Sequence, residues 1–188
     1  VKLLLNYSER IELNARSNNG RTAFICACED GHKDVVHILL DHSSIELNAR
    51  CINGENAFLR SCRRGQKDVV QLLMDHSERI ELNARNNDGW TAFMLACQEG
   101  QTDVVQLLLD HSDGIELNTR KNDGWTAFML ACIFEHKDVV KLLLDHSERI
   151  DFNTRNNDGY TAFISACNNG HKDVVKLLLD HSDRIDFN

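Results

Sequence analysis

A repeat of 34 or 35 residues runs through the whole 188-residue chain. Turn glycines stand at successive steps of 34, 35, 35 and 35 residues, namely Gly20, Gly54, Gly89, Gly124 and Gly159. A unit of this length is one supersecondary element that cannot bury its apolar face alone, so neighbouring units must stack. The sequence therefore predicts a solenoid whose core runs along the stack.

The repeat also sets the expected domain organisation. We expect a single domain, residues 1–188, with a partial unit at 1–13 and a further unit beginning at 188. The five full units between them are 14–47, 48–82, 83–117, 118–152 and 153–187. Terminal units of repeat proteins normally carry polar caps, and none is visible in this sequence. We therefore expect the chain to be a piece of a longer array.

Each unit begins with a turn signal and continues with two helical segments. Residues 80–84 alternate apolar and polar side chains and lead into Asn87-Asp88-Gly89, which predicts a β-hairpin-like tip. Thr91 is a suitable N-cap for the apolar stretch that follows, and Gly100 is a suitable left-handed residue to end it. A second, amphipathic helix is expected over 103–110, since its polar residues fall on one stripe.

The recurring residues resemble the ankyrin repeat over the whole chain. The third unit reads Asn86-x-x-Gly89-x-Thr91-Ala92-Phe93-Met94-x-Ala96-Cys97, then Gly100-Gln101-x-x-Val104-Val105-x-x-Leu108-Leu109. The resemblance implies an all-α ankyrin-repeat solenoid of helix-turn-helix units. Two family positions differ in every unit: proline is replaced by alanine (Ala23, Ala57, Ala92, Ala127 and Ala162), and histidine by an apolar residue (Ile25, Leu59, Met94, Met129 and Ile164).

Composition excludes several classes of function. The net charge is −8, whereas a nucleic-acid-binding surface needs clustered Lys and Arg. No apolar run approaches the ~20 residues of a membrane-spanning helix. The seven cysteines are an odd number, which argues against a complete disulfide framework. We expect an intracellular protein, in the cytoplasm, that does not bind nucleic acid and does not span a membrane.

The repeated polar residues have structural explanations, so we expect no enzyme, cofactor or metal. A histidine closes every second helix, where it can contact helix-end carbonyls: His42, His76, His111, His146 and His181. Cysteines at the family's second small position are expected to be buried: Cys28, Cys62, Cys97, Cys132 and Cys167. Cys51, in contrast, lies near a tip, where exposure is expected. No phosphate-binding loop, nucleophile elbow or metal-spaced cluster is present.

The residues that vary between units are the candidates for recognition. In the ankyrin family the binding groove is formed by the tips and the exposed part of the first helix. The resemblance therefore implicates the position after the turn glycine (Arg21, Glu55, Trp90, Trp125 and Tyr160) and the pairs before the second glycine, above all Arg63-Arg64 and Ile133-Phe134. Trp, Tyr and Arg are frequent interface anchors. The alternative is that the aromatic side chains only pack on adjacent tips.

We therefore expect a protein-interaction module that binds a peptide or folded partner on its concave face. Trp90, Trp125, Phe134 and Tyr160 would anchor the partner, and Arg21, Arg63 and Arg64 would attract an acidic segment. The alternative is a structural spacer, or an array that self-associates through uncapped ends. A third possibility is a module that serves an enzyme or channel elsewhere in a longer protein. The resemblance also implies that tip asparagines such as Asn83 can be hydroxylated.

One position breaks the repeat. Glu135 stands where the other units have the glycine that ends the first helix. Positive φ at a residue other than glycine costs about 1 kcal/mol, unless the loop takes a different shape. Such a break is typical of a functional or strained site, and drift after duplication explains it equally well.

Overall fold

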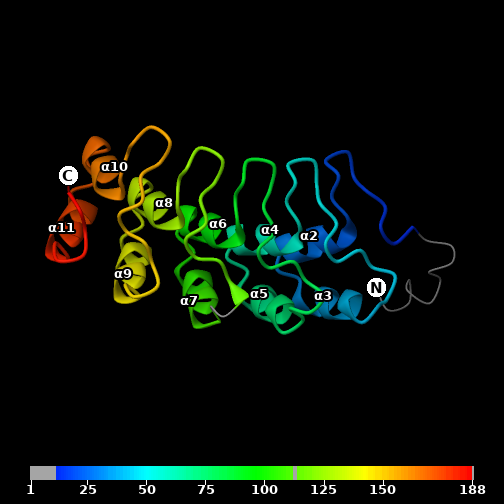
Figure 1. The fold of residues 1–188 in the computed structure, drawn as a ribbon. Coiled ribbons are helices and arrows are strands. Elements are labelled where there is room, and N and C mark those ends of the chain that lie inside the picture. The colour runs from blue at the N-terminus through cyan, green and yellow to red at the C-terminus, as the bar shows by residue number, and fades with distance from the viewer. Residues whose placement is uncertain (1–11, 112–113, 188) are drawn as a thin grey trace.

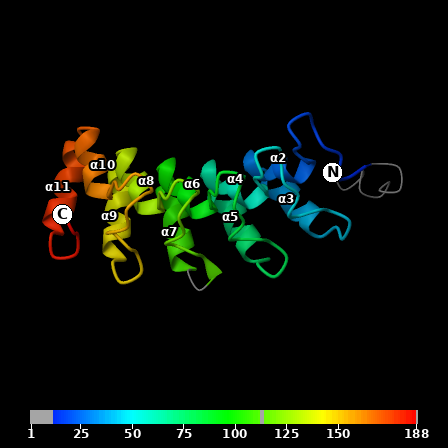
Figure 2. The ribbon, with the colours of Figure 1, turned by 45° about the horizontal axis from the view of Figure 1, so that its top comes forward.

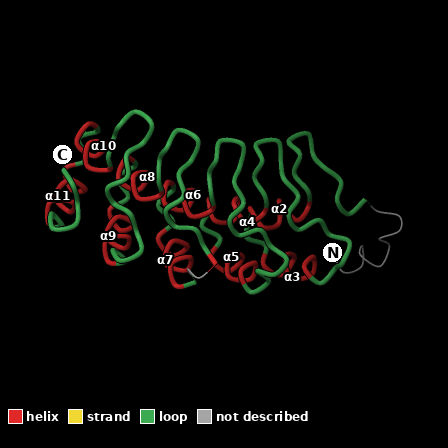
Figure 3. The backbone as a smooth tube through the Cα atoms, viewed as in Figure 1, coloured by secondary structure: helices red, strands yellow, loops and turns green. Residues whose placement is uncertain are grey.

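A computed structural model describes residues 12–111 and 114–187. Residues 1–11 of the expected partial unit, and the unit start expected at residue 188, lie outside the described residues. Within the described part there are ten α-helices and no strand (Figures 1 and 3). They form five pairs, one for each unit: α2 (Ala23–Glu29) with α3 (Lys33–Leu40), α4 (Ala57–Arg63) with α5 (Lys67–Met74), α6 (Ala92–Gln98) with α7 (Thr102–Asp110), α8 (Ala127–Ile133) with α9 (Lys137–Asp145), and α10 (Ala162–Asn168) with α11 (Lys172–Asp180).

The helix pairs stack side by side into an elongated array. The first helices of successive units contact one another in one row, the second helices form another row, and the two helices within each unit contact each other. The tips project side by side beyond the row of first helices (Figure 1), and the turned view shows the same order of units (Figure 2). The predicted all-α ankyrin-repeat solenoid is thus confirmed.

The first helices begin at the residues that the sequence predicts. Their N-cap threonines each accept a hydrogen bond at Oγ1 from the backbone N–H three residues later, over 3.2–3.4 Å; these are Thr22, Thr91, Thr126 and Thr161. In the second unit Asn56 takes this place and accepts from Leu59 at 3.0 Å. These side chains satisfy backbone donors that the first turn of a helix leaves unpaired.

A left-handed residue follows each first helix. Gly100 has a φ of 67°, and Glu135 has the same kind of conformation at φ 60°. The loop of the fourth unit therefore keeps its shape and accepts the strain. A Cβ atom on Gly100 would lie 2.4 Å from Nδ1 of His136, whereas Glu135 lies beside the corresponding His171, with Oε2 3.4 Å from Nδ1.

The core is a ladder of equivalent side chains. Phe24, Phe58, Phe93 and Phe128 are each at most 1% exposed. Cys28, Cys62, Cys97 and Cys132 are buried as predicted, and burial raises the pKa of each thiol. Cys167 is exposed, against the prediction, because no later first helix in the described chain covers α10.

Backbone hydrogen bonds organise the tips, although these form no strands. In the third unit Asn86 N–H donates to the Trp90 carbonyl at 3.0 Å, which closes the tip. Each tip also donates one N–H to a carbonyl of the tip before it, over 3.0–3.1 Å: Ile52 to Asn19, Asn87 to Asn53, Asn122 to Asp88, and Asn157 to Asp123. This packing buries Cys51, so its expected exposure was wrong.

Candidate protein-binding face

Three aromatic side chains stand at equivalent positions where the tips meet the first helices. We call Trp90, Trp125 and Tyr160 the aromatic row. The two tryptophans are half-buried and pack against the core, whereas Tyr160 is exposed. Asparagine side chains fix two of these residues, because Asn86 Oδ1 accepts from Trp90 N–H at 2.9 Å and Asn156 Oδ1 accepts from Tyr160 N–H at 2.8 Å. The row is thus held by tip geometry as well as by packing.

A cavity of about 340 Å³ lies between the third and fourth units, and we call it the first cavity. Its lining consists of Trp90, Gln98, Lys121, Trp125, Leu130, Ile133 and Phe134. Phe134 is 50% exposed, which is unusual for a phenylalanine in this chain. Lys121 places Nζ 4.9 Å from the centroid of the Trp90 ring, within the range of a cation–π contact.

A second cavity of about 320 Å³ adjoins the first. It is lined by Trp125, Ile133, Asn156, Asp158, Tyr160, Ser165, Asn168 and Asn169. The two cavities share Trp125 and Ile133, so they are neighbouring sections of one surface across three units. The structure thus brings five predicted residues onto this surface: Trp90, Trp125, Ile133, Phe134 and Tyr160.

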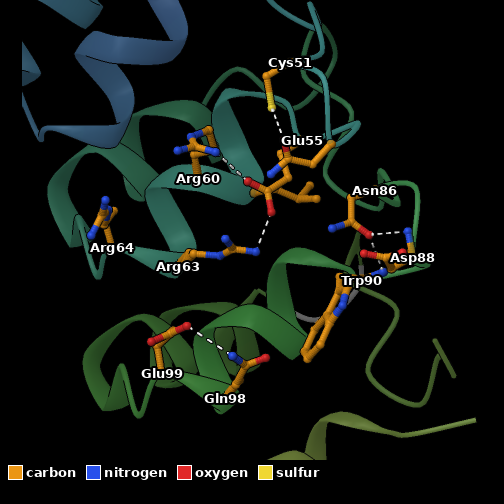
Figure 4. Close-up of polar contacts among 12 residues, drawn as sticks. Cys51, Glu55, Arg60, Arg63, Arg64, Asn86, Asp88, Trp90, Gln98 and Glu99 are labelled. Atoms are coloured by element: carbon orange, nitrogen blue, oxygen red, sulfur yellow. Dashed lines mark hydrogen bonds and ion pairs between the residues drawn. The ribbon is translucent and has the colours of Figure 1, made fainter. Parts of the chain in front are cut away.

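The first two units present a cluster of charges in the equivalent region. Buried Glu29 pairs with Arg21 at 2.9 Å, with Arg60 at 2.6 Å and with Arg64 at 3.2 Å. Buried Glu55 pairs with Arg60 at 2.7 Å and also with Arg63 (Figure 4). We call these six residues the arginine cluster. The Arg60 hydrogen bond lowers the pKa of Glu29 to about 2, more strongly than burial raises it.

The arginine cluster changes the interpretation of four predicted site residues. Glu55 is 0% exposed, so the expectation that it contacts a partner is wrong. Arg21, Arg63 and Arg64 lie at the surface, but each is paired with a buried carboxylate. The four arginines of the cluster share two carboxylates, so half of their positive charge is compensated within the fold and the cluster keeps a net charge of +2. The attraction for an acidic segment stays a prediction. Arg60 is not predicted from the sequence as a site residue, because its partners Glu29 and Glu55 lie in two different units.

The repeated histidines contact helix-end carbonyls, as predicted. Nδ1 lies 2.8–3.0 Å from the carbonyl oxygen four residues earlier in His76, His111, His146 and His181. His42 differs, since its Nδ1 accepts from Ser44 N–H. In residues 12–111 and 114–187, no three His, Cys, Asp or Glu side chains are grouped as metal ligands would be.

The tip asparagines join successive units. Asn83 donates from Nδ2 to the Gly114 carbonyl at 2.8 Å and accepts at Oδ1 from Glu116 N–H at 2.9 Å. Asn48 and Asn118 make the same pair of bonds. Both ends of the amide are thus used in structure, which the sequence analysis did not anticipate. The repeat alignment could have indicated it, because these positions are invariant over the full units.

Comparison with known proteins agrees with the architecture. The family model for ankyrin repeats in three copies matches residues 1–51, 44–121 and 113–188. A search of curated proteins finds none that matches the chain. No helix within the described ranges is long and apolar enough to cross a membrane. The recurring tip, N-cap and helix pair, together with a family match that covers the whole chain, place this protein in the ankyrin-repeat family.

Proposed function

We propose that this chain binds a protein segment across the two adjoining cavities of the third to fifth units. Ankyrin repeats are generally protein–protein interaction modules. The observation that carries the proposal is the sharing of Trp125 and Ile133 between the two cavities, which gives a continuous surface. A segment that follows this surface would contact the whole aromatic row.

The exposure of the anchors supports this choice of surface. Phe134 and Tyr160 are 50% and 38% exposed, and their equivalents in the first unit are the polar residues Asp30 and Arg21. Covering apolar area contributes about 25 cal/mol per Å² to binding, before the costs of association are subtracted. Aromatic side chains next to a recess are typical interface anchors. The equivalent region of the first two units presents the charged arginine cluster instead of aromatic anchors.

The test is a double substitution, Trp125→Ala with Phe134→Ala. A random peptide library is selected on the wild-type chain, and affinities of the selected peptides are measured by calorimetry. We expect the double variant to bind at least ~100-fold more weakly, because interface anchors contribute a few kcal/mol together. Leu179→Ala is the matched control, since Leu179 is 48% exposed on α11, away from both cavities. Equal affinities for the wild type and a folded double variant would refute the proposal.

The alternative that the sequence leaves open is a self-associating spacer. The fifth unit exposes Ile164 and Leu179 at 36% and 48%, together with Cys167. If these residues mediate assembly, the mass measured by light scattering will rise with concentration, and Leu179→Asp will prevent this rise. A constant monomeric mass at all concentrations would exclude self-association as the function.

A further inference from the structure

The fourth and fifth units allow an internal comparison of the two cavities. Positions 35 residues apart are equivalent, so Lys121 corresponds to Asn156, Asp123 to Asp158, and Trp125 to Tyr160. Each cavity has an aromatic side chain from the earlier unit, and the tip of the later unit faces it. Lys121 faces Trp90 in the first cavity, and Asn156 lines the second cavity with Trp125.

The first cavity shows what this arrangement accommodates. Lys121 places its ammonium 4.9 Å from the centroid of the Trp90 ring and pairs it with the Asp123 carboxylate. Its side chain is only 13% exposed, so the aliphatic stem lies along the surface as well. An indole face and a tip carboxylate together hold a lysine side chain that belongs to the chain itself.

The second cavity has an indole and a tip carboxylate at the equivalent positions, but no lysine. Trp125, Asp158 and Tyr160 all line it. Asn156 is shorter and neutral, and its Oδ1 accepts from the N–H groups of Asp158 and Tyr160 at 3.0 and 2.8 Å, so it turns towards its own tip. Asp158 is exposed, and no Lys or Arg of the described residues forms an ion pair with it.

We propose that the second cavity takes a lysine side chain of the bound protein, with its ammonium against the Trp125 ring and paired with Asp158. Tyr160, which also lines the cavity, would contact the stem. This inference rests on the proposed function and adds the chemistry of the partner: a basic segment, in keeping with the net charge of −8. Arg21, Arg63 and Arg64, for which an acidic segment is expected, belong to the first two units and do not line this cavity.

The direct test uses a lysine fragment and its uncharged analogue. N-acetyl-lysine-N-methylamide is titrated into the labelled full chain, and the two indole N–H signals are followed by NMR, with Trp90→Phe used to assign them. We expect a saturable shift of the Trp125 signal and no saturable shift of the Trp90 signal. N-acetyl-norleucine-N-methylamide has the same stem without the ammonium, so it should cause no such shift. An equal response to both fragments would overturn the proposal.

Exchanging the residues of the two cavities gives a sharper test. Asn156→Lys should supply an internal ammonium and abolish the response of Trp125 to the lysine fragment. Lys121→Asn should remove the ammonium at Trp90 and transfer a response to that indole. Both exchanges are compatible with the fold, because each tip closes through a backbone hydrogen bond whichever of the two side chains is present. In the fourth unit Lys121 N–H donates to Trp125 O at 3.0 Å, and in the fifth unit Asn156 N–H donates to Tyr160 O at 2.9 Å.

The carboxylate has its own matched pair of variants. Asp158→Asn should weaken binding of the lysine fragment several-fold, whereas Asp88→Asn, at the equivalent place in the third unit, should leave it unchanged. Persistence of the Trp125 shift in both Asn156→Lys and Asp158→Asn would overturn the lysine site. The proposed function would still stand if the Trp125→Ala and Phe134→Ala double variant lost its selected peptides, so the two failures are distinguishable.

Discussion

At the scale of single residues, the most consequential feature is the pair of buried carboxylates in the arginine cluster. Glu29 is 4% exposed and Glu55 is 0% exposed, and each pairs with arginines from more than one position in the chain. Removing water from a charge is costly unless the charge is paired and hydrogen-bonded. Glu29 of the first unit pairs with Arg60 and Arg64 of the second, so it fixes the two units against each other while its carboxylate is ionised.

This dependence predicts an acid-sensitive stability. The pKa of Glu29 falls from its usual 4.5 to about 2 in the folded chain, so ionised Glu29 stabilises the fold at pH above its unfolded-state pKa. The contribution, on the order of 3 kcal/mol, should be lost as the pH falls from 5 towards 2. Urea unfolding at several pH values measures it. Glu29→Gln should be less stable at pH 7 and should lose less stability over this interval; identical pH profiles would contradict the assignment.

Residues differ in how far the sequence predicts their roles. The repeat spacing predicts the positions of the aromatic row, because each member stands directly after a turn glycine. The N-cap threonines are predicted by their place before an apolar run. Arg63 and Glu55 could not be assigned in this way. Their pairing depends on which side chains α4 brings within reach of the tip, and a repeat alignment carries no signal for contacts that occur in one unit only. The lysine–indole contact of the first cavity is of the same kind.

At the scale of the helices, the consistent absence of proline is the informative feature. Ala92 and Ala127 are the first residues of α6 and α8, where the backbone N–H has no partner within the helix. The preceding threonines are extended, with ψ of 166° in both Thr91 and Thr126. This is the conformation that a following proline requires. The local backbone is therefore compatible with proline although the sequence does not use it.

We therefore expect Ala92→Pro and Ala127→Pro each to raise the free energy of unfolding by about 0.4–1 kcal/mol. The gain comes from the unfolded chain, which has fewer conformations to lose. Urea unfolding of the two single variants and the double variant measures it. Ala96→Pro, in the interior of α6, serves as the control and should destabilise by about 3 kcal/mol or more. A loss of stability in the first two variants would mean that their ring cannot be accommodated beside the neighbouring unit.

At the scale of the whole molecule, every unit is stabilised chiefly by its neighbours. First helices contact first helices and second helices contact second helices along the stack. Stability in such arrays is close to a sum of unit and interface terms. A unit covered on both sides should therefore open less often than one covered on a single side. The sequence predicts this arrangement fully, because it follows from the repeat length and the apolar faces alone.

The repeated cysteines allow this gradient to be measured. Native-state thiol labelling, read by mass spectrometry of peptides, should modify Cys167 first, since it is exposed. Part-buried Cys26 should follow, and the buried thiols Cys28, Cys62, Cys97 and Cys132 should react only on local opening. Cys167→Ser should remove the fast phase alone. Simultaneous labelling of all the buried thiols would indicate global unfolding as the only route.

The hydrogen bonds between tips bear on how a gene for such a chain can change. Among the described tips, each one after the first gives one N–H to the tip before it, so the four junctions between the five tips have the same connection. Duplicating or deleting a segment as long as one repeat unit preserves that connection, wherever in the unit the segment begins. An insertion of one residue within a tip would move its N–H donor out of register with the carbonyl oxygen of the previous tip. A change in the number of units therefore leaves the hydrogen bonds between tips intact. The one-residue difference in length between Ser43-Ser44-Ile45 and Ser77-Glu78-Arg79-Ile80 falls outside the tips.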